Sequence, residues 1–316
     1  MNPNANEAAG AARNARHSID DAALDHLRAV VDMPDVSGTR YELIEVIGRG
    51  GMGTVWRARD LLLDREVALK VLADPDEPLA REIGLRLAQE AKVLARLEHP
   101  GIVPVHDVGV LADGRAFTCM KLVRGRRLDA LLAERPPESE SLSLFARVAQ
   151  SVAFAHSCGV LHLDIHPGNV MVGEFGEVLV LDWGLAAPTG DDATLAAGTP
   201  GFMAPEQRAS GVSVDARADV HGLGAILGAL LAATEVPRPL AAIVARATEA
   251  LPDERYAGVA ALAADVRAWL DQTPVSAYHE SLVELVVRLY HRHQALVLLL
   301  VTYLVMRLAI FAWRAI

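Results

Sequence analysis

The sequence predicts an α+β fold of two lobes: a small antiparallel sheet, then a larger helical lobe, with an apolar helix at the C-terminal end. Three observations carry this prediction. Short apolar runs separated by Gly- and Asp-containing turns fill residues 41–123. Helix-period patterns dominate after residue 128, and residues 295–313 are apolar almost throughout. A cleft between lobes is a usual place for a ligand.

Composition excludes several classes of protein. Hydrophobic residues make up 52% of the 316, enough to bury a core, so a wholly disordered chain is excluded. The formal net charge of −10 argues against nucleic acid as a partner. The two cysteines, Cys119 and Cys158, exclude a disulfide scaffold and a four-cysteine zinc site, and they suit a reducing cytosol.

The first forty residues are predicted to be an extension without a secretory leader, because no basic segment precedes an apolar one. Within it, apolar residues at helical spacing indicate a short packing helix at 18–33. Apolar runs then predict the strands of the first lobe, interrupted by a helix at 80–97. The predicted strands are 41–46, 54–58, 67–71, 101–108 and 116–123.

The second lobe is predicted from three apolar stripes with helical period and one hairpin. The hairpin pairs 170–172 with 178–181. The stripes are Phe145, Val148 and Val152, then the residues 220–231, then Leu262, Val266 and Leu270.

The first motif is a glycine loop, GxGxxG, at 48–53. In a dinucleotide-binding fold a helix would follow this motif, but Thr54–Ala58 has the pattern of a strand. The loop therefore joins two strands, where glycines let the backbone lie close to a polyphosphate. Lys70 ends the apolar run 67–70 and is one of three lysines in the chain. It can direct an ammonium group at the phosphates.

The second motif is the run His162-Leu163-Asp164-Ile165-His166-Pro167-Gly168-Asn169, followed by the predicted hairpin and Asp182-Trp183-Gly184. Asp182 and Asn169 offer the oxygen ligands that Mg²⁺ prefers. Asp164 can orient and deprotonate an attacking hydroxyl. A zinc site is the rival interpretation, but the spacing of the histidines matches no common zinc pattern.

Taken together, these motifs resemble the protein kinase superfamily, and within it the eukaryote-like Ser/Thr protein kinases of bacteria. The resemblance covers 41–271 and implies a protein-kinase-like fold with an N-lobe at 41–123 and a C-lobe at 124–271. It implies phosphoryl transfer from ATP, with Mg²⁺, to Ser or Thr hydroxyls of a protein substrate.

The resemblance assigns a role to each matching residue. Asp164 matches the catalytic base, Lys70 the phosphate-anchoring lysine and Glu90 its carboxylate partner. His166 stands where the family has a lysine near the γ-phosphate, and Thr199 matches the threonine that contacts the catalytic loop. Asn169 and Asp182 match the metal ligands. The implied nucleotide contacts are Gly48, Gly50, Gly53, Val55, Lys70, Met120 as gatekeeper, and Lys121 to Val123 as hinge.

Three more positions fit the resemblance. Ala204-Pro205-Glu206 matches the end of the activation segment, and Asp219 matches the buried aspartate that braces the catalytic loop. Arg255 matches the late arginine that pairs with Glu206.

Departures from the pattern keep two alternatives open. Leu163 replaces the arginine that normally receives a phosphate on the activation segment, which argues against switching through Thr189, Thr194 or Thr199. The residues 232–240 are short for the usual docking helix. These features, with His166, also suit a nucleotide-binding pseudokinase scaffold. The His-x-Asp-x-His loop is found in small-molecule kinases of the aminoglycoside and choline type, although the Ala-Pro-Glu segment argues against them.

The C-terminal segment is predicted to anchor the chain. Residues 295–313 would span ~28 Å as a helix, close to the thickness of a bilayer core. Arg307 opposes insertion, while basic residues in 272–294 would place the kinase domain on the inner side of the cell membrane. This predicts a cytoplasmic kinase domain tethered to the membrane. The alternative is a helix that packs on the kinase domain or on a second copy in a homodimer.

Overall fold

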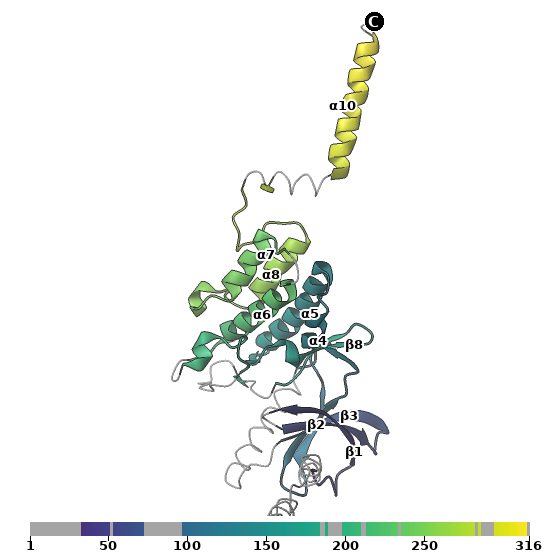
Figure 1. Cartoon of the computed structure of the whole chain (residues 1–316), viewed down its shortest axis with the longest axis vertical. Coiled ribbons are helices and arrows are strands. Elements are labelled where there is room, and N and C mark those ends of the chain that lie inside the picture. The colour runs from purple at the N-terminus through teal and green to yellow at the C-terminus, as the bar shows by residue number, and fades with distance from the viewer. Residues whose placement is uncertain are drawn as a thin grey trace, which may run out of the picture. The chain divides into compact units, whose positions relative to one another are not determined.

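The computed structural model describes residues 33–50, 53–72, 97–183, 187–188, 198–209, 213–232, 235–281, 284–285 and 294–314 (Figure 1). The chain divides into two compact units. One contains the described residues up to 85 together with 107–119, and the other contains 86–106 and the residues from 120 onward. The predicted helices at 18–33 and 80–97 lie almost entirely outside the described residues.

The first unit is built on a five-stranded sheet with the order β1-β2-β3-β5-β4. Strands β1, β2 and β3 pair antiparallel, as predicted, with Tyr41 opposite Asp60 and Val55 opposite Lys70. The strands are β1 (Tyr41–Gly50), β2 (Gly53–Asp60), β3 (Arg65–Leu72), β4 (Val105–Val110) and β5 (Ala116–Lys121).

Alternating apolar residues of these strands form a core of their own, since one face of the sheet carries the side chains that pack together. Val67, Leu69 and Cys119 are completely buried there. The ring of Tyr41 packs edge-on against Phe117, with ring centroids 5.7 Å apart. Its hydroxyl donates a hydrogen bond to Asp107 at 2.8 Å, which satisfies the polar end of a buried side chain.

Asp60 closes the turn between β2 and β3. Its carboxylate is completely buried and accepts hydrogen bonds from the backbone N–H groups of Leu62 and Leu63, both at 3.2 Å. Arg40 and Arg65 lie 3.5 and 3.7 Å from the same carboxylate and balance its charge. A buried carboxylate with these partners fixes the hairpin that presents β3.

The second unit is mainly helical, as predicted. Helix α5 (Glu138–Ser157) packs against α6 (Ala216–Leu231) and α8 (Val259–Leu270), and α7 (Arg238–Ala247) packs against α6 (Figure 1). The stripe Val220, Leu223 and Leu227 is completely buried because residues three and four apart share one helix face. A short helix, α4 (Leu128–Ala133), precedes α5.

Short strands and 3₁₀ turns of this unit hold the functional loops. A three-stranded sheet has the order β6-β8-β9, and its β8–β9 hairpin pairs Val170 with Val180 as predicted. The strands are β6 (Gly125–Arg127), β7 (Val160–Leu161), β8 (Val170–Gly173), β9 (Val178–Val180) and β10 (Ala187–Pro188), and β10 pairs with β7. The 3₁₀ turns are η1 (Pro167–Asn169), η2 (Pro205–Arg208) and η3 (Pro252–Glu254).

One predicted strand is shorter than expected. The run 101–108 was predicted as a single strand, but β4 begins only at Val105. Ile102 instead forms an isolated parallel bridge with Val180 in the second unit. Pro104 explains the interruption, because it has no N–H to donate to a ladder. The apolar residues before it are buried in the second unit.

The last helix, α10, covers Gln294–Arg314, so the predicted helix at 295–313 is present. Among the described residues, no helix is long and apolar enough to cross a membrane. The transmembrane interpretation of 295–313 is therefore not supported. Arg307, the charge that opposes insertion, lies inside this helix.

Candidate active site

The glycine loop joins β1 to β2, and Gly50 pairs with Gly53 across the hairpin. Gly53 has φ +145°, and a Cβ atom there would collide with the backbone carbonyl of Val71 on the next strand. Only glycine fits this position. Since a strand and not a helix follows Gly53, the hairpin prediction is confirmed and the arrangement of a dinucleotide-binding fold is excluded for this motif.

Lys70 lies on β3, between the buried residues Leu69 and Val71, so its side chain points away from the core of the first unit. Lys70 stands opposite Val55 on β2. Gly48 also lies beside Val55, because a Cβ atom added at Gly48 would be 3.8 Å from the Cβ of Val55. The sheet thus brings together Gly48, Val55 and Lys70. Glu90, the predicted partner of Lys70, lies outside the described residues.

The predicted gatekeeper and hinge leave the sheet at the end of β5. Met120 and Lys121 are the last residues of that strand, and Val123 follows it half-buried. The N–H of Lys121 donates to the carbonyl of Pro104 at 3.1 Å. This hydrogen bond fixes the backbone where the chain passes from the sheet to the second unit.

The backbone of the predicted catalytic loop, residues 162–169, is held by Asp219, a buried residue of α6. Its carboxylate accepts hydrogen bonds from the N–H of His162 at 2.8 Å and the N–H of Leu163 at 2.7 Å, and it contacts His156 Nε2 at 2.8 Å. These hydrogen bonds lower the pKa of Asp219, although burial alone would raise it. The bracing role predicted for Asp219 therefore matches its observed contacts.

Leu163 takes a backbone conformation that is rare for residues other than glycine, with φ +65°. The two hydrogen bonds to Asp219 hold it in place. Its side chain is buried in a small apolar cluster with Leu161, Ala204, Val214 and Ala218. The catalytic loop thus meets the segment around Ala204 through apolar packing.

Asp164 is the centre of a polar cluster. Its Oδ1 accepts two hydrogen bonds from Thr199, from the N–H at 2.9 Å and from the hydroxyl at 3.0 Å. Its Oδ2 faces the amide nitrogen of Asn169 at 3.4 Å and the Nε2 of His166 at 3.7 Å. The Asp164 side chain remains 19% exposed, which leaves it open to a small group from outside. The structure therefore brings together Asp164, Thr199, Asn169 and His166.

His166 presents one defined nitrogen to Asp164. Its Nδ1 accepts a hydrogen bond from the N–H of Gly168 at 3.2 Å, so in the neutral ring the proton lies on Nε2. Nε2 is the atom that faces Asp164. Burial lowers the pKa of His166, an effect only partly opposed by the nearby Asp164 carboxylate. At neutral pH the ring is thus an uncharged donor.

Asn169 and Asp182 lie close together at the ends of neighbouring elements. The N–H of Leu181 donates to the carbonyl of Asn169 at 2.8 Å. The Asn169 amide nitrogen donates to the carbonyl of Asp164 at 3.0 Å, so its side-chain oxygen is the atom that can bind a cation. Asp182 has φ +52°, a strained conformation of the kind found at functional sites.

Trp183, where the resembled family has phenylalanine, is 1% exposed and packs on His162 with ring centroids 4.5 Å apart. The Nε2 of His162 contacts the carbonyl of Leu181 at 3.0 Å. These contacts tie the loop before Asp164 to the chain that carries Asp182. Gly184, Thr189 and Thr194 lie outside the described residues.

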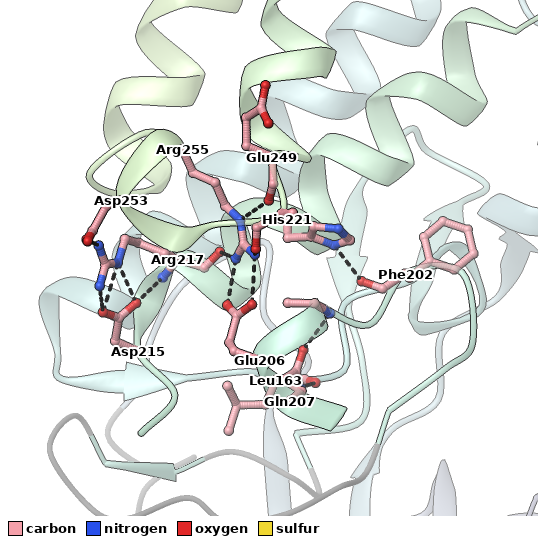
Figure 2. Close-up of polar contacts among 12 residues, drawn as sticks. Leu163, Phe202, Glu206, Gln207, Asp215, Arg217, His221, Glu249, Asp253 and Arg255 are labelled. Atoms are coloured by element: carbon pink, nitrogen blue, oxygen red, sulfur yellow. Dashed lines mark hydrogen bonds and ion pairs between the residues drawn. The ribbon is translucent and has the colours of Figure 1, made fainter. Parts of the chain in front are cut away.

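A buried ion pair between Glu206 and Arg255 fixes the end of the segment 198–209 (Figure 2). Arg255 donates to both carboxylate oxygens of Glu206, at 2.6 and 2.7 Å, and its side chain is completely buried. It also donates to the carbonyls of Arg217, Glu249 and Ala250. The predicted pairing of Arg255 with Glu206 is thus present.

Two residues of this framework were not predicted. Gln207 accepts a hydrogen bond from the N–H of Ala204 and donates one to the carbonyl of Leu163 at 2.7 Å (Figure 2). His156 contacts Asp219, 63 positions later in the chain. Neither residue belongs to a sequence motif that would predict its contact. The position of Gln207 next to Glu206 is the one sequence feature that points to a structural role.

Across the parts of the chain that the structure describes, no group of three or more His, Cys, Asp or Glu is placed to hold a metal ion. His162 and His166 make the separate contacts given above and share no ligand geometry. Asp182 and Asn169 offer two oxygen ligands. A cation bound by these two can complete its coordination with oxygens of a bound substrate and water.

Comparison with known proteins places the chain in a family. A family model described as "Protein kinase domain" matches residues 41–255, more than half of the chain. The chain is 42% identical over 210 residues to the "DNA damage-responsive serine/threonine-protein kinase RqkA" of Deinococcus radiodurans, covering 62% of this chain and 30% of that protein.

Two further relatives are of the same kind. "Serine/threonine-protein kinase PknB" of Mycobacterium leprae is 38% identical over 205 residues, covering 61% of this chain and 32% of that protein. "Serine/threonine-protein kinase PknD" of Chlamydia caviae is 32% identical over 298 residues, covering 74% and 32%. The chain spans about a third of the length of these curated relatives. With the match over residues 41–255, the chain belongs to the protein kinase family.

Proposed function

We propose that this chain transfers the γ-phosphoryl group of ATP to Ser or Thr hydroxyls of proteins. The observation that carries the proposal is the environment of Asp164, whose carboxylate is held by Thr199 and stands beside Asn169 and His166. The similarity to bacterial Ser/Thr protein kinases supports the same reaction. We take the kinase domain as 41–271, in the cytoplasm, where ATP is available.

Asp164 acts as the base that orients the acceptor hydroxyl and takes its proton. Because Thr199 already occupies Oδ1, we assign proton acceptance to Oδ2, the oxygen that faces His166. Neutral His166 presents an N–H group toward this oxygen, 3.7 Å away, and adds no fixed charge. Phosphoryl transfer needs little covalent help from the protein, so the main contribution of this loop is to position the acceptor.

Lys70 and the glycine loop would hold the phosphates of ATP. Gly48, Gly50 and Gly53 lie on the hairpin, where backbone without side chains can approach a polyphosphate closely. Lys70 supplies a positive charge from the neighbouring strand, and Glu90 is proposed to pair with it. Val55, Met120, Lys121 and Val123 are proposed to contact the adenosine part.

Mg²⁺ fits the residues present. Asn169 and Asp182 supply two hard oxygen ligands, and Mg²⁺ is commonly bound through few protein ligands with substrate phosphates and water as the rest. Bound there, it would neutralise charge on the phosphates. The carbonyl oxygen of the Asn169 side chain is directed by the hydrogen bond that its amide nitrogen gives to Asp164.

A protein, and not a small metabolite, is the proposed acceptor. The residues 198–209 are fixed against residues 162–169 by Thr199 and Gln207, and Glu206 is held by Arg255. The segment 198–209 therefore lies beside the loop that carries Asp164. A protein substrate can dock on this segment. The pseudokinase and small-molecule kinase alternatives are outcomes of the experiment that follows.

The experiment is radiolabelled phosphate transfer from ATP and Mg²⁺ by the full chain, to itself and to a generic unfolded acceptor protein. Wild type, Asp164→Asn, Lys70→Met and the surface control Asp271→Asn are compared. We expect label with wild type and the control, and loss of label by a factor of roughly 10³ or more in the other two variants.

Other results would contradict the proposal. Nucleotide binding detected by thermal shift, with no label in any sample, would indicate a pseudokinase scaffold. Label found only on an aminoglycoside or choline would indicate a small-molecule kinase. Normal transfer by Lys70→Met would show that the role given to Lys70 is wrong.

A further inference from the structure

A basic stretch, Arg124-Gly125-Arg126-Arg127, lies beside the catalytic loop in the second unit. All four residues are exposed. Gly125–Arg127 form strand β6, which pairs with β8 so that Arg127 stands opposite Met171. Met171 comes two residues after Asn169. The pairing therefore places the end of the basic stretch next to the loop that carries Asp164 and His166.

The Arg127 guanidinium reaches the catalytic loop itself. A Cβ atom added at Gly168 would lie 2.5 Å from Nη2 of Arg127 and 2.7 Å from the ring of His166. Because residue 168 has no side chain, the guanidinium can lie in van der Waals contact with the loop between His166 and Asn169. A fixed positive charge is thus held a few ångströms from the ring that faces the Asp164 carboxylate.

Arg126 and Arg127 differ in how their charge is used. Arg126 forms a bidentate ion pair with Glu134, the residue that follows α4, so two of its guanidinium nitrogens are already engaged. Arg127 forms one ion pair among the described residues, with its Nε 3.6 Å from the Asp129 carboxylate, and both side chains are about half exposed (55% and 52%). A long, exposed pair of this kind is weak and exchanges easily with other carboxylates.

We propose that Arg127 is a specificity-determining residue that selects protein substrates with an Asp or Glu side chain next to the phosphoacceptor hydroxyl. This inference rests on the proposed kinase function. With the hydroxyl at Asp164, a flanking carboxylate reaches the guanidinium over Gly168 and replaces Asp129 as its partner. Arginine suits this role because its fork of donors matches the two oxygens of a carboxylate.

The basic stretch has the opposite sign to the net charge of the whole chain. At a formal net charge of −10 the protein repels acidic partners at long range. Arg127 opposes that field beside the loop where the acceptor hydroxyl is proposed to bind. Complementary charges at a binding site mainly give specificity, which is the property proposed here.

The test measures peptide binding to the full chain, independently of phosphate transfer. Three fluorescently labelled peptides share one sequence with Ala in place of the acceptor and carry Glu, Gln or Lys at the flanking positions. Fluorescence anisotropy is recorded for wild type, Arg127→Gln, Arg127→Glu and the matched control Arg126→Gln, with a non-hydrolysable ATP analogue present. Thermal melting confirms that each exposed-site variant is folded.

We expect wild type and Arg126→Gln to bind the Glu peptide roughly two- to fivefold more tightly than the Gln peptide, and the Lys peptide most weakly. Arg127→Gln should lose this preference, and Arg127→Glu should favour the Lys peptide. With Ser restored as acceptor, the change should appear in KM, with kcat nearly constant.

The inference is overturned if Arg127→Gln keeps the wild-type preference, or if wild type binds none of the three peptides. It is also overturned if Arg127→Gln weakens binding of the ATP analogue instead, since the guanidinium would then serve the nucleotide. Absence of phosphate transfer with the binding preference intact would contradict only the proposed function. The two failures are therefore distinguishable.

Discussion

The Asp164 carboxylate receives two hydrogen bonds from Thr199, which stands 35 positions later in the chain. Both go to Oδ1, one from the backbone N–H at 2.9 Å and one from the hydroxyl at 3.0 Å. The other oxygen, Oδ2, faces Asn169 and His166. The segment after residue 198 thus orients the proposed base, and the two oxygens have different surroundings.

Thr199→Val removes the hydroxyl hydrogen bond and keeps the backbone one. A hydrogen bond to a charged group contributes about 1.5–3 kcal/mol, so we expect kcat for phosphate transfer to fall by roughly tenfold or more. Thr199→Ser restores the hydroxyl and should stay within about threefold of wild type. Equal rates for Val and Ser variants, measured by steady-state kinetics, would show that the hydroxyl does not orient Asp164.

Arg255→Met should strongly destabilise the second unit. The Arg255 side chain is completely buried, and its loss would leave the Glu206 carboxylate buried without its partner. Breaking a buried ion pair in this way costs about 3–5 kcal/mol. Urea unfolding followed by tryptophan fluorescence measures the loss.

Two controls accompany the Arg255 variant. Arg126→Gln breaks an exposed pair with Glu134 and should cost at most about 1 kcal/mol. The double variant Arg255→Met, Glu206→Met should recover part of the loss, because no buried charge is left unpaired. A double variant as unstable as the sum of the single ones would argue that the two residues act independently.

Asp219→Asn should change how stability depends on pH. Burial alone would raise the pKa of Asp219, but the contact with His156 and the hydrogen bond from the N–H of His162 outweigh it, so the pKa is lowered in the folded state. Its contribution to stability is therefore fully present above the unfolded pKa of about 3.9 and is lost as pH falls through the lower folded value.

The free energy of unfolding of wild type and Asp219→Asn, measured by urea unfolding from pH 7 down to pH 3, tests this. At pH 7 the variant should be less stable by about 1–3 kcal/mol, and the difference should shrink below pH 4. Asp271→Asn, an exposed control, should follow wild type throughout. A difference that stays constant with pH would mean that the charge of Asp219 is not what braces the loop.

Local patterns predicted much of the fold and the site. The glycine hairpin at 48–53 and the strand with Lys70 follow from short runs of sequence, because a turn and its two strands involve neighbouring residues. The cluster of Asp164, His166 and Asn169 was predicted for the same reason, since its residues lie within six positions of one another. The family resemblance added the long-range pair Glu206–Arg255.

What the sequence did not show depends on contacts between distant residues. Gln207 donates a hydrogen bond to the carbonyl of Leu163, 44 positions away, and its place next to Glu206 does not identify that partner. Ile102 has the pattern of a strand residue, yet it pairs with Val180 by a single bridge in the second unit. Such contacts depend on how distant parts of the chain pack together, and local patterns in a single sequence do not predict that packing.

His166→Gln should alter the pH dependence of phosphate transfer. Burial lowers the pKa of His166, so the ring is neutral at pH 7 and gains a proton only below its usual range. The imidazolium would then lie 3.7 Å from Asp164 and lower the proton affinity of the proposed base. We therefore expect wild-type kcat to fall as pH decreases through this lowered pKa.

Glutamine can donate a hydrogen bond and does not titrate, so His166→Gln should keep kcat within about tenfold at pH 7.5 and lose this acidic limb of the profile. The measurement is kcat from pH 5 to 8 at saturating ATP and acceptor. His221→Gln is a matched control, because His221 is also partly buried with a lowered pKa but contacts the carbonyl of Phe202 instead of Asp164. An identical acidic limb in wild type and His166→Gln would assign that limb to another group and leave His166 with a positioning role only.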